Sequence, residues 1–339
     1  MKFLITTIAY EPKTGGIETH SKLLAQALID LGHEVTIVTD TASNQNENLP
    51  WKIYRKPSFY KLWRCYVEAD LIIQNNFSIK LGWPIVLLNA RSVIIHHTWL
   101  TDGTRRAKRL LSLKQWFCDF SIQFANSKAI ADRVRDKSIV IGNPYDESIF
   151  YRREAIKGEK RIIIVGRLVC DKGIDIAIKA LSIMHAEGFL IKMTIVGEGN
   201  EENHLREMVE EMGISKFVNF KGVLKGDELA ETYAEHQICL IPSRWEEPFG
   251  IVALEALACG CRVVYSDGGG LREAVGEQGI SFVKEDKIGC AEALKEAIQK
   301  SEYTIEEWQN VQGHLEKFKR DSYFKNLFRL IEGHCKIKL

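Results

Sequence analysis

The chain has 339 residues, of which 45% are apolar and 27% are charged, and its formal net charge is +1. This composition is ordinary for a folded globular protein, and the length favours two domains. The near-zero net charge excludes a global field that would attract nucleic acid or an acidic partner, so any charged site must be local.

The eight cysteines show no spacing that is typical of a metal site. Cys259 and Cys261 are separated by one residue, and no second Cys or His pair completes a zinc set. We interpret the cysteines as reduced thiols. The apolar run at the start of the chain is too short for a secretion signal, and no run approaches the roughly 18 apolar residues of a membrane span. We therefore expect a cytoplasmic protein that needs neither a metal nor a cofactor.

The first part of the chain predicts a parallel α/β domain. An apolar strand at 3–9 is followed by Gly15-Gly16, a helical apolar pattern over 17–31 and a second strand at 34–39. This strand–helix–strand opening implies a parallel sheet. Further strands are predicted at 71–74, 85–88, 92–95, 121–125 and 139–141, and residues 41–66 are less regular.

A second domain of the same class follows. Asn143-Pro144 and the charge-rich residues 151–160 indicate a linker. The pattern then predicts strands at 161–165, 190–196, 217–220, 238–241 and 262–265, and helices at 174–187, 201–212, 226–235 and from Gly250. We therefore predict two Rossmann-like, doubly wound domains, residues 1–150 and 151–320, that face each other across a cleft. A last helix at about 321–339 is expected to pack back on the first domain.

The segment Ser243–Ala256, S-R-W-E-E-P-F-G-I-V-A-L-E-A, carries the densest chemical signal. It follows a predicted strand and opens a helix, so Glu247 lies in the loop and Glu255 lies inside the helix. Free amides at a helix start can bind an anion or a hydroxyl, and a carboxylate deeper in the helix can accept both hydroxyls of a ribose. Acidic residues near a helix start are common for other reasons, but the Glu-Pro-Phe-Gly context favours a ligand site.

A second signal lies where the first strand of the second domain turns into its helix, in the segment Val165–Gly173. A diphosphate that is bound without a metal must meet Arg, Lys and helix N-termini. Arg167 and Lys172 are placed on one loop to straddle such a group, although two solvated surface charges would give the same pattern. Gly15-Gly16 permits a phosphate or sugar to approach the backbone closely, as an ordinary turn also would. The chain contains no Asp-x-Asp, in agreement with a metal-free site.

Together these segments resemble glycosyltransferase family four, the retaining group 1 glycosyltransferases of the GT-B fold. The resemblance covers nearly the whole chain and is more specific in the second domain than in the first. The matches are Glu247 and Glu255 for the Glu-x7-Glu motif, Gly166, Arg167, Lys172 and Gly173 for the Gly-Arg-x4-Lys-Gly loop, and Gly15 and Gly16 for the Gly-Gly loop. Asn143-Pro144-Tyr145-Asp146 is similar to the interdomain Asn-Gly-Val-Asp, with Pro in place of Gly.

The resemblance implies a role for each matching residue. Arg167 and Lys172 would hold the donor diphosphate, Glu255 the ribose, and Glu247 the hydroxyls of the donor sugar. The other donor-binding residues that it implies are Gly15, Gly16, Gly166, Gly197, Gly222, Val223, Pro248, Phe249, Gly250 and Ile251. A strand-end histidine approaches the donor sugar in this family, and here the strand ends in His96-His97. We place His96 first of the two.

The resemblance also implies the reaction, which is transfer of a hexose-type sugar from a nucleoside-diphosphate sugar, with UDP as the default. The acceptor would be a glycan or a lipid-linked molecule in the synthesis of cell-surface polysaccharide or glycolipid. The alternatives are a nucleotide-sugar epimerase of the same architecture and a sugar-nucleotide-binding protein without activity. A dehydrogenase is least favoured, because Glu202 breaks the dinucleotide fingerprint after Gly197 and Gly199.

Two segments of the first domain join basic residues to apolar and aromatic ones. These are residues 56–64 and residues 105–117. Such a combination suits the anionic surface of a membrane, which would make the protein peripheral on the inner face of the cell membrane. Amphipathic helices with a solvated basic side would show the same pattern. We expect no nucleic-acid partner.

Overall fold

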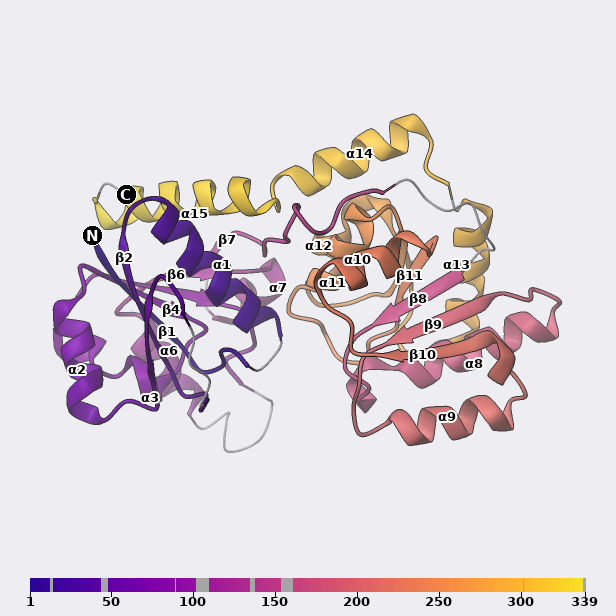
Figure 1. Ribbon diagram of the computed structural model, residues 1–339, viewed down its shortest axis with the longest axis horizontal. Helices are drawn as coiled ribbons and strands as arrows, with labels where there is room; N and C mark the ends of the chain where they lie inside the picture. Colours follow the sequence, from indigo (N-terminus) through magenta and orange to yellow (C-terminus); the bar gives the residue numbers. More distant parts are fainter. Residues whose placement is uncertain are drawn as a thin grey trace. The chain divides into compact units, whose positions relative to one another are not determined.

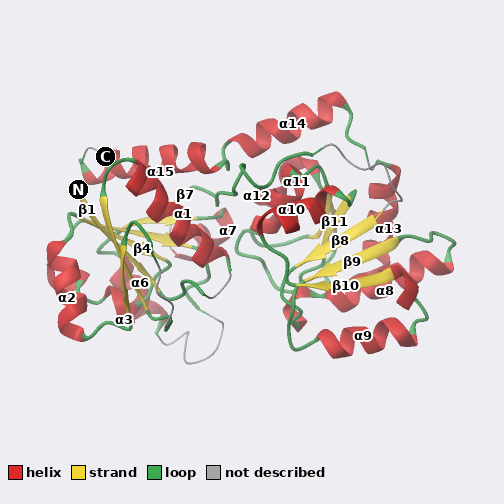
Figure 2. Cartoon of the chain, in the orientation of Figure 1, coloured by secondary structure: helices red, strands yellow, loops and turns green. Residues whose placement is uncertain are grey.

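The computed structural model describes residues 1–12, 15–43, 48–88, 90–101, 110–134, 138–153, 161–300 and 302–337. The chain divides into two compact units, the first formed by Met1–Pro144 with Arg320–Leu339 and the second by Tyr145–Lys319 (Figure 1). Each unit has one sheet with helices on both of its faces, as Figure 2 shows. The second unit thus begins just after Asn143-Pro144.

Within its described residues, the first unit has a seven-stranded parallel sheet of order β3-β2-β1-β4-β5-β6-β7. The strands are β1 (Lys2–Thr7), β2 (Glu34–Thr39), β3 (Lys52–Arg55), β4 (Leu71–Asn75), β5 (Ser92–His96), β6 (Ile122–Ala125) and β7 (Ile139–Val140). The helices are α1 (Gly16–Asp30), α2 (Phe59–Glu68), α3 (Ile79–Gly82), α4 (Ile85–Leu88), α6 (Leu111–Cys118), α7 (Lys128–Val134) and α15 (Arg320–Cys335). All residues of β4 and β5 are buried, because helices cover both faces of a parallel sheet.

The last helix, α15, packs against α1 and the first sheet (Figure 1). Its residues Tyr323, Leu327 and Ile331 are buried in the same hydrophobic cluster as Leu24 and Leu28 of α1. This spacing of four residues places the apolar side chains on one face of the helix. The end of the chain therefore contributes to the core of the unit that its beginning forms.

Two expectations for the first unit were wrong in their secondary structure. Residues 85–88 form helix α4 and not a strand. A four-residue apolar run does not distinguish the two forms, and Pro84, whose carbonyl accepts from Leu87 and Leu88, favours the start of a helical turn. Residues 41–66, which looked irregular, contain β3 and most of α2, and Ser58 caps α2 by accepting from the Lys61 amide.

The second unit has a six-stranded parallel sheet of order β10-β9-β8-β11-β12-β13 within the described residues. The strands are β8 (Arg161–Val165), β9 (Lys192–Val196), β10 (Val218–Gly222), β11 (Ile238–Ile241), β12 (Arg262–Ser266) and β13 (Ile280–Phe282). The α-helices are α8 (Ile174–Ala186), α9 (Glu202–Glu211), α10 (Gly226–Ala234), α11 (Ile251–Ala258), α12 (Leu271–Val275), α13 (Lys287–Gln299) and α14 (Ile305–Glu316). Short 3₁₀ turns lie at Cys170–Lys172, Ser215–Phe217 and Gly276–Gln278.

The strand order of this second sheet reverses between β8 and β11. From β8 the chain continues outward to β9 and β10, and from β11 it continues in the other direction to β12 and β13. The two strands pair directly, with Ile238 beside Ile162. The loops at their carboxyl ends therefore diverge and leave a crevice, which is where open α/β sheets bind ligands.

Candidate active site

The two loops at this switch point carry the charged residues that the sequence singled out. The loop after β8 contains Arg167 and Lys172, and the loop after β11 contains Glu247. Of the predicted site residues, Gly166, Arg167, Lys172, Gly197, Gly222, Val223, Glu247, Pro248, Phe249, Gly250, Ile251 and Glu255 lie in the second unit, and Gly15, Gly16 and His96 lie in the first.

Glycines allow the loops of the second unit to pack closely. Gly173 has φ 63°, and a Cβ atom there would collide with the Pro242 carbonyl of the loop after β11. Gly197, at the end of β9, has φ 138°, and a Cβ atom there would collide with the carbonyl of Gly166. Because any larger residue would separate these loops, the glycines fix the distance between the strand ends.

Lys172 and Glu247 form an ion pair across the crevice. The Lys172 Nζ atom lies 2.5 Å from Oε1 of Glu247, and the Ser243 hydroxyl donates to the same oxygen at 2.6 Å. Burial alone would raise the pKa of Glu247, but the Lys172 ammonium and these hydrogen bonds outweigh it and lower that pKa. The carboxylate is therefore ionised and only 8% exposed, with its charge compensated by Lys172.

Arg167 differs from Lys172 in its surroundings. Its side chain is exposed, and it makes no hydrogen bond or ion pair with any residue that the structure describes. The loop after β8 thus offers one cation that is already paired and one that faces solvent. Two cations on one short loop are suited to an anion with more than one charge.

Glu255 lies inside α11, beside Tyr233 of α10. Desolvation raises the pKa of Glu255 to about 8. The carboxyl group is therefore largely protonated at neutral pH in this ligand-free form. Hydroxyl donors that reached it would favour its ionised form and lower this pKa.

The start of α11 closes the site on the other side. Gly250 is the N-cap of the helix, and the Glu247 carbonyl accepts from the Gly270 amide at 2.7 Å. Phe249 is buried, and its ring lies 5.5 Å from that of Phe318. The Glu-Pro-Phe-Gly turn is therefore anchored by its carbonyl and its aromatic ring, while the helix start presents the amides that have no partner inside the helix.

The backbone also brings together the ends of the outer strands. The Gly166 amide donates to the Val196 carbonyl at 3.0 Å, and the Gly197 amide donates to the Gly222 carbonyl at 2.7 Å. Val223, which follows Gly222, is 45% exposed. The predicted donor-binding residues Gly166, Gly197, Gly222 and Val223 thus form one continuous edge.

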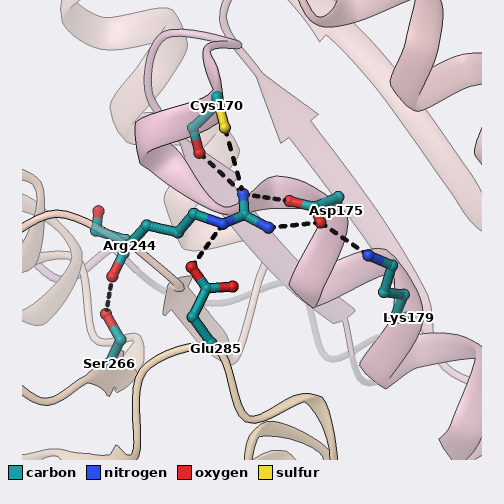
Figure 3. Close-up of polar contacts among 7 residues, drawn as sticks. Cys170, Asp175, Lys179, Arg244, Ser266 and Glu285 are labelled. Carbon is teal, nitrogen blue, oxygen red and sulfur yellow. Dashed lines mark hydrogen bonds and ion pairs between the residues drawn. The ribbon is translucent and has the colours of Figure 1, made fainter.

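Sequence reasoning missed Arg244, whose contacts Figure 3 shows. Its guanidinium forms two hydrogen bonds with Asp175, of 2.6 and 2.7 Å, an ion pair of 2.7 Å with Glu285, and a hydrogen bond of 2.9 Å to the Cys170 carbonyl. Burial alone would raise the pKa of Asp175, but hydrogen bonds from Arg244 and Lys179 outweigh it and lower this pKa to about 2. The bidentate geometry is the strong form of this ion pair.

Arg244 also holds the two loops through its backbone. The Arg244 amide donates to the Asp171 carbonyl at 2.9 Å, next to Lys172. The residue therefore fixes the turn that carries Lys172 relative to the loop that carries Glu247. Asp175 lies four residues before Lys179 and in the first turn of α8, where an acidic residue has an ordinary helix role, so the sequence contained no signal for its pairing with Arg244.

The structure does not favour His96 as a ligand-contacting residue. Its side chain has no exposed surface, and its Nε2 atom lies 3.3 Å from the Gln123 oxygen of the neighbouring strand. Burial lowers the pKa of His96 to about 4. His97 follows the strand end and is 4% exposed, and its Nε2 atom lies 2.7 Å from the Oδ1 atom of Asn75. Strand side chains alternate between faces, so the pair diverges and His96 enters the core.

Gly15 and Gly16 lie at the start of α1, where Gly15 is the N-cap and has an extended backbone. The glycine loop therefore joins a strand end to a helix start, as the sequence predicted for this βα turn.

Among the described residues, no group of three or more His, Cys, Asp or Glu side chains is arranged to hold a metal ion. No helix in the described ranges is long and apolar enough to cross a membrane.

The fold matches that of known glycosyltransferases. The crystal structure of Anabaena HepE in complex with UDP-glucose aligns with a TM-score of 0.82 at 19% sequence identity, and the alignment covers 98% of this chain and 100% of that one. The protein therefore has the GT-B fold of two parallel α/β units.

Two family models together match most of the chain. The model of glycosyltransferase family 4 matches residues 14–148, and the model of glycosyl transferases group 1 matches residues 146–309. The chain belongs to the group 1 glycosyltransferases.

Curated relatives support the same family over most of their length. An uncharacterised glycosyltransferase of Methanocaldococcus jannaschii is 29% identical over 324 residues, which cover 81% of this chain and 83% of the relative. The gpi3 subunit of the Schizosaccharomyces pombe phosphatidylinositol N-acetylglucosaminyltransferase is 24% identical over 335 residues, which cover 85% of this chain and 70% of the relative.

Proposed function

We propose that this chain is a cytoplasmic, retaining glycosyltransferase that moves a hexose-type sugar from a nucleoside-diphosphate sugar to a glycan or lipid-linked acceptor. The product would belong to a cell-surface polysaccharide or glycolipid. The observation that carries the proposal is the Lys172–Glu247 pair, with Arg167 exposed beside it, at the switch point of the second sheet. A paired cation and a paired carboxylate can each exchange their partner for part of a donor molecule.

The cations act on the leaving group. When the bond between the sugar carbon and the phosphate oxygen breaks, its electron pair goes to the diphosphate, and negative charge grows there. Arg167 and Lys172 would meet this charge without a metal, and their effect is greatest in the transition state, where the charge is largest. The loop glycines hold the backbone that carries both cations in place, so only the side chain of Lys172 has to change its partner.

The carboxylate acts on the sugar. Glu247 would accept hydrogen bonds from donor-sugar hydroxyls once Lys172 turns toward the diphosphate. The sugar passes through an oxocarbenium-like state, the acceptor oxygen bonds to the sugar carbon from the face that the diphosphate leaves, and the acceptor proton passes to the diphosphate. The configuration at the sugar carbon is then retained. We assign no side chain as a nucleophile.

The nucleoside would lie along the edge formed by Gly197, Gly222 and Val223, with its ribose on Glu255. Uridine is the first base to test, because HepE of the same fold was crystallised with UDP-glucose. Glu255 carries the one polar side chain of α11, so it is the side-chain acceptor that this helix can offer to a ribose.

The test is a donor screen that follows release of the nucleoside diphosphate. UDP-, GDP- and ADP-sugars are incubated with the protein, with and without EDTA, first alone and then with pooled acceptors. Release from one donor that EDTA does not reduce is the expected result. Interconversion of the sugar without release would instead identify an epimerase. Nucleotide binding without release under any condition would identify a binding protein.

A further inference from the structure

Helix α2 has two apolar faces, and only one of them lies in the core. Leu62, Cys65 and Tyr66 are buried. At about 100° per residue, a second set falls within an arc of about 100° beside them. This set consists of Phe59, Tyr60, Trp63 and Val67. One apolar face suffices to anchor a helix, so the exposed part of the second face is available for a contact outside this unit.

Most of the second face is exposed, although Trp63 is half-buried, and the face extends to Trp83 and to α4. Phe59, Tyr60 and Val67 are 70%, 69% and 59% exposed. The Phe59 ring stacks on Trp83 at 4.2 Å, and Leu87 of α4 is 67% exposed. We call Phe59, Tyr60, Trp63, Val67, Trp83 and Leu87 the aromatic surface. Single exposed apolar residues are normal, but a contiguous set marks an interaction site.

A basic cavity adjoins the aromatic surface. Its volume is about 330 Å³, and the side chains that line it include the exposed Lys56 and Lys80 and the buried Leu62 and Leu81. 

Asp40 and Pro57 complete the lining of the cavity. The Lys80 Nζ atom lies 2.6 Å from Asp40.

The cavity and the aromatic surface belong to the same segments of the chain. Pro57 lies just before Phe59, and Leu81 lies just before Trp83. Lys56 is exposed and has φ 43°, a left-handed conformation that its amide helps to hold by donating to the Thr39 carbonyl at 2.8 Å. The backbone thus keeps the lysine at the mouth of the cavity, beside exposed rings.

The charges of this region favour an anionic partner. Lys56, Lys61, Arg64 and Lys80 stand against Asp40 and Glu68, so four basic side chains face two acidic ones. We propose that the aromatic surface and the basic cavity together dock on an anionic lipid membrane, with a lipid phosphate at Lys56 and Lys80 and the rings at the boundary of the acyl chains. A second copy of the chain fits less well, because a symmetric contact would bring like charges together.

The proposal rests on α2, α3, α4, Trp83 and the cavity residues Asp40, Lys56 and Pro57. In the other basic segment, residues 105–109 lie outside the described residues. Leu113 and Trp116 of α6 are 43% and 47% exposed, but the cavity does not include them.

The experiment is flotation of the full chain with vesicles, in the absence of any nucleotide sugar. One set of vesicles contains phosphatidylcholine only, and the other also contains phosphatidylglycerol. We expect binding to the anionic vesicles only, and weaker binding at high salt, because salt screens the lysines. Equal binding to both sets, or none to either, would overturn the proposal.

Two pairs of substitutions locate the surface. Phe59→Ser with Leu87→Ser is compared with Ile305→Ser, since Ile305 of the second unit is 81% exposed. Lys56→Gln with Lys80→Gln is compared with Lys216→Gln, which removes an exposed charge of the second unit. We expect the loss of each lysine to weaken vesicle binding about fivefold, and the substitution of Phe59 and Leu87 to weaken it further. The two control variants are expected to bind as the unchanged protein does. Controls that lose as much binding would show that the surface is not at α2–α4.

Three further measurements separate the other outcomes. Thermal unfolding shows whether each variant is folded. Sedimentation velocity without vesicles shows whether Phe59→Ser with Leu87→Ser changes the oligomeric state, and such a change would identify a contact between copies in place of a membrane. Release of nucleoside diphosphate in solution is unaffected by these variants if the proposed reaction is right, so failure of the docking surface and failure of the reaction are distinguishable.

Discussion

The carboxyl edges of the two sheets differ in their electrostatic character. In the second unit, the edge carries Arg167, Lys172 and Glu247, and the last two form an ion pair. In the first unit, the corresponding edge carries a buried polar cluster. His97 contacts Asn75 at 2.7 Å, and His20 contacts the Tyr323 hydroxyl at 2.9 Å.

The cluster of the first unit is neutral. Burial lowers the pKa of His20 to about 3 and that of His97 to well below its usual value. Their rings lie 4.4 Å apart, so a proton on one would also repel a proton on the other. The carboxyl edge of the second unit, which we call the charged edge, therefore stabilises charge. That of the first unit, the neutral edge, provides uncharged hydrogen-bond donors and acceptors. We propose that the charged edge suits a diphosphate and that the neutral edge suits the uncharged groups of the sugar or the acceptor.

The largest expected effect comes from Lys172→Ala, which removes a cation from the charged edge. We expect turnover to fall by about 10²–10³, because the charge that develops on the diphosphate loses a positioned partner. The measurement is the rate of nucleoside-diphosphate release at saturating donor. Lys172→Arg keeps the charge and is expected to retain more activity than Lys172→Ala.

The same substitution also leaves Glu247 buried without its cation. Glu247→Ala and the double variant separate the two effects in a double-mutant cycle. If the double variant is no less active than Lys172→Ala, the two residues act as one unit. If Lys172→Ala keeps near-normal turnover, the diphosphate role of Lys172 is wrong.

A smaller effect is expected from Arg244→Ala, which removes the link between the two loops. The bidentate pair with Asp175 is mostly shielded from solvent, so we expect a loss of about 2 kcal/mol in the free energy of unfolding. Because Arg244 positions Lys172, turnover should fall more than donor affinity does. Arg206→Ala, which breaks a more exposed pair with Glu202, serves as the control and should change stability by less than about 0.5 kcal/mol. Equal losses in the two variants would contradict the role of Arg244.

The sequence predicted the members of the charged edge because topology places them. Strands β8 and β11 are adjacent in a doubly wound sheet, so residues that follow them converge whatever the details of the loops. The pairing of Arg244 with Asp175 depends on the conformation of both loops, which no local pattern encodes. His96 and His97 were ambiguous for a similar reason, since alternation shows that they face opposite sides but not which side is open. Residues 85–88 were too few to separate strand from helix.

The neutral edge makes the first unit sensitive to acid. Below pH 6.5 the unfolded His20 binds a proton that the folded one does not, so stability is lost as the pH falls toward the folded pKa of about 3. At pH 5 the loss is roughly 2 kcal/mol for His20 alone. His20→Gln should therefore show a shallower fall in unfolding free energy between pH 6.5 and pH 5 (denaturant titrations), whereas His204→Gln, at an exposed position, should not. If the unfolding free energy falls equally with pH in the unchanged protein, His20→Gln and His204→Gln, His20 accepts a proton in the folded state.

The smallest effect concerns Glu255, where the charged edge contains a neutral group. Its folded pKa of about 8 lies above the usual value of 4.5, so the folded state holds a proton that the unfolded state has lost between these values. Stability should therefore fall as the pH rises from 5 to 8, and Glu255→Gln should remove that fall. Since the side chain keeps some exposure, we expect only about 1 kcal/mol.

Nucleotide binding should reverse the protonation of Glu255. Ribose hydroxyls that donate to its carboxylate favour the ionised form, so UDP binding near pH 7 would release a proton and tighten as the pH rises toward 8. Calorimetry in two buffers of different ionisation enthalpy measures this proton directly. Glu255→Gln should bind UDP more weakly and with no dependence of the heat on the buffer. If the unchanged protein also shows no such dependence, the ribose does not lie on an ionised Glu255, and the neutral acid would instead have to donate to the ligand.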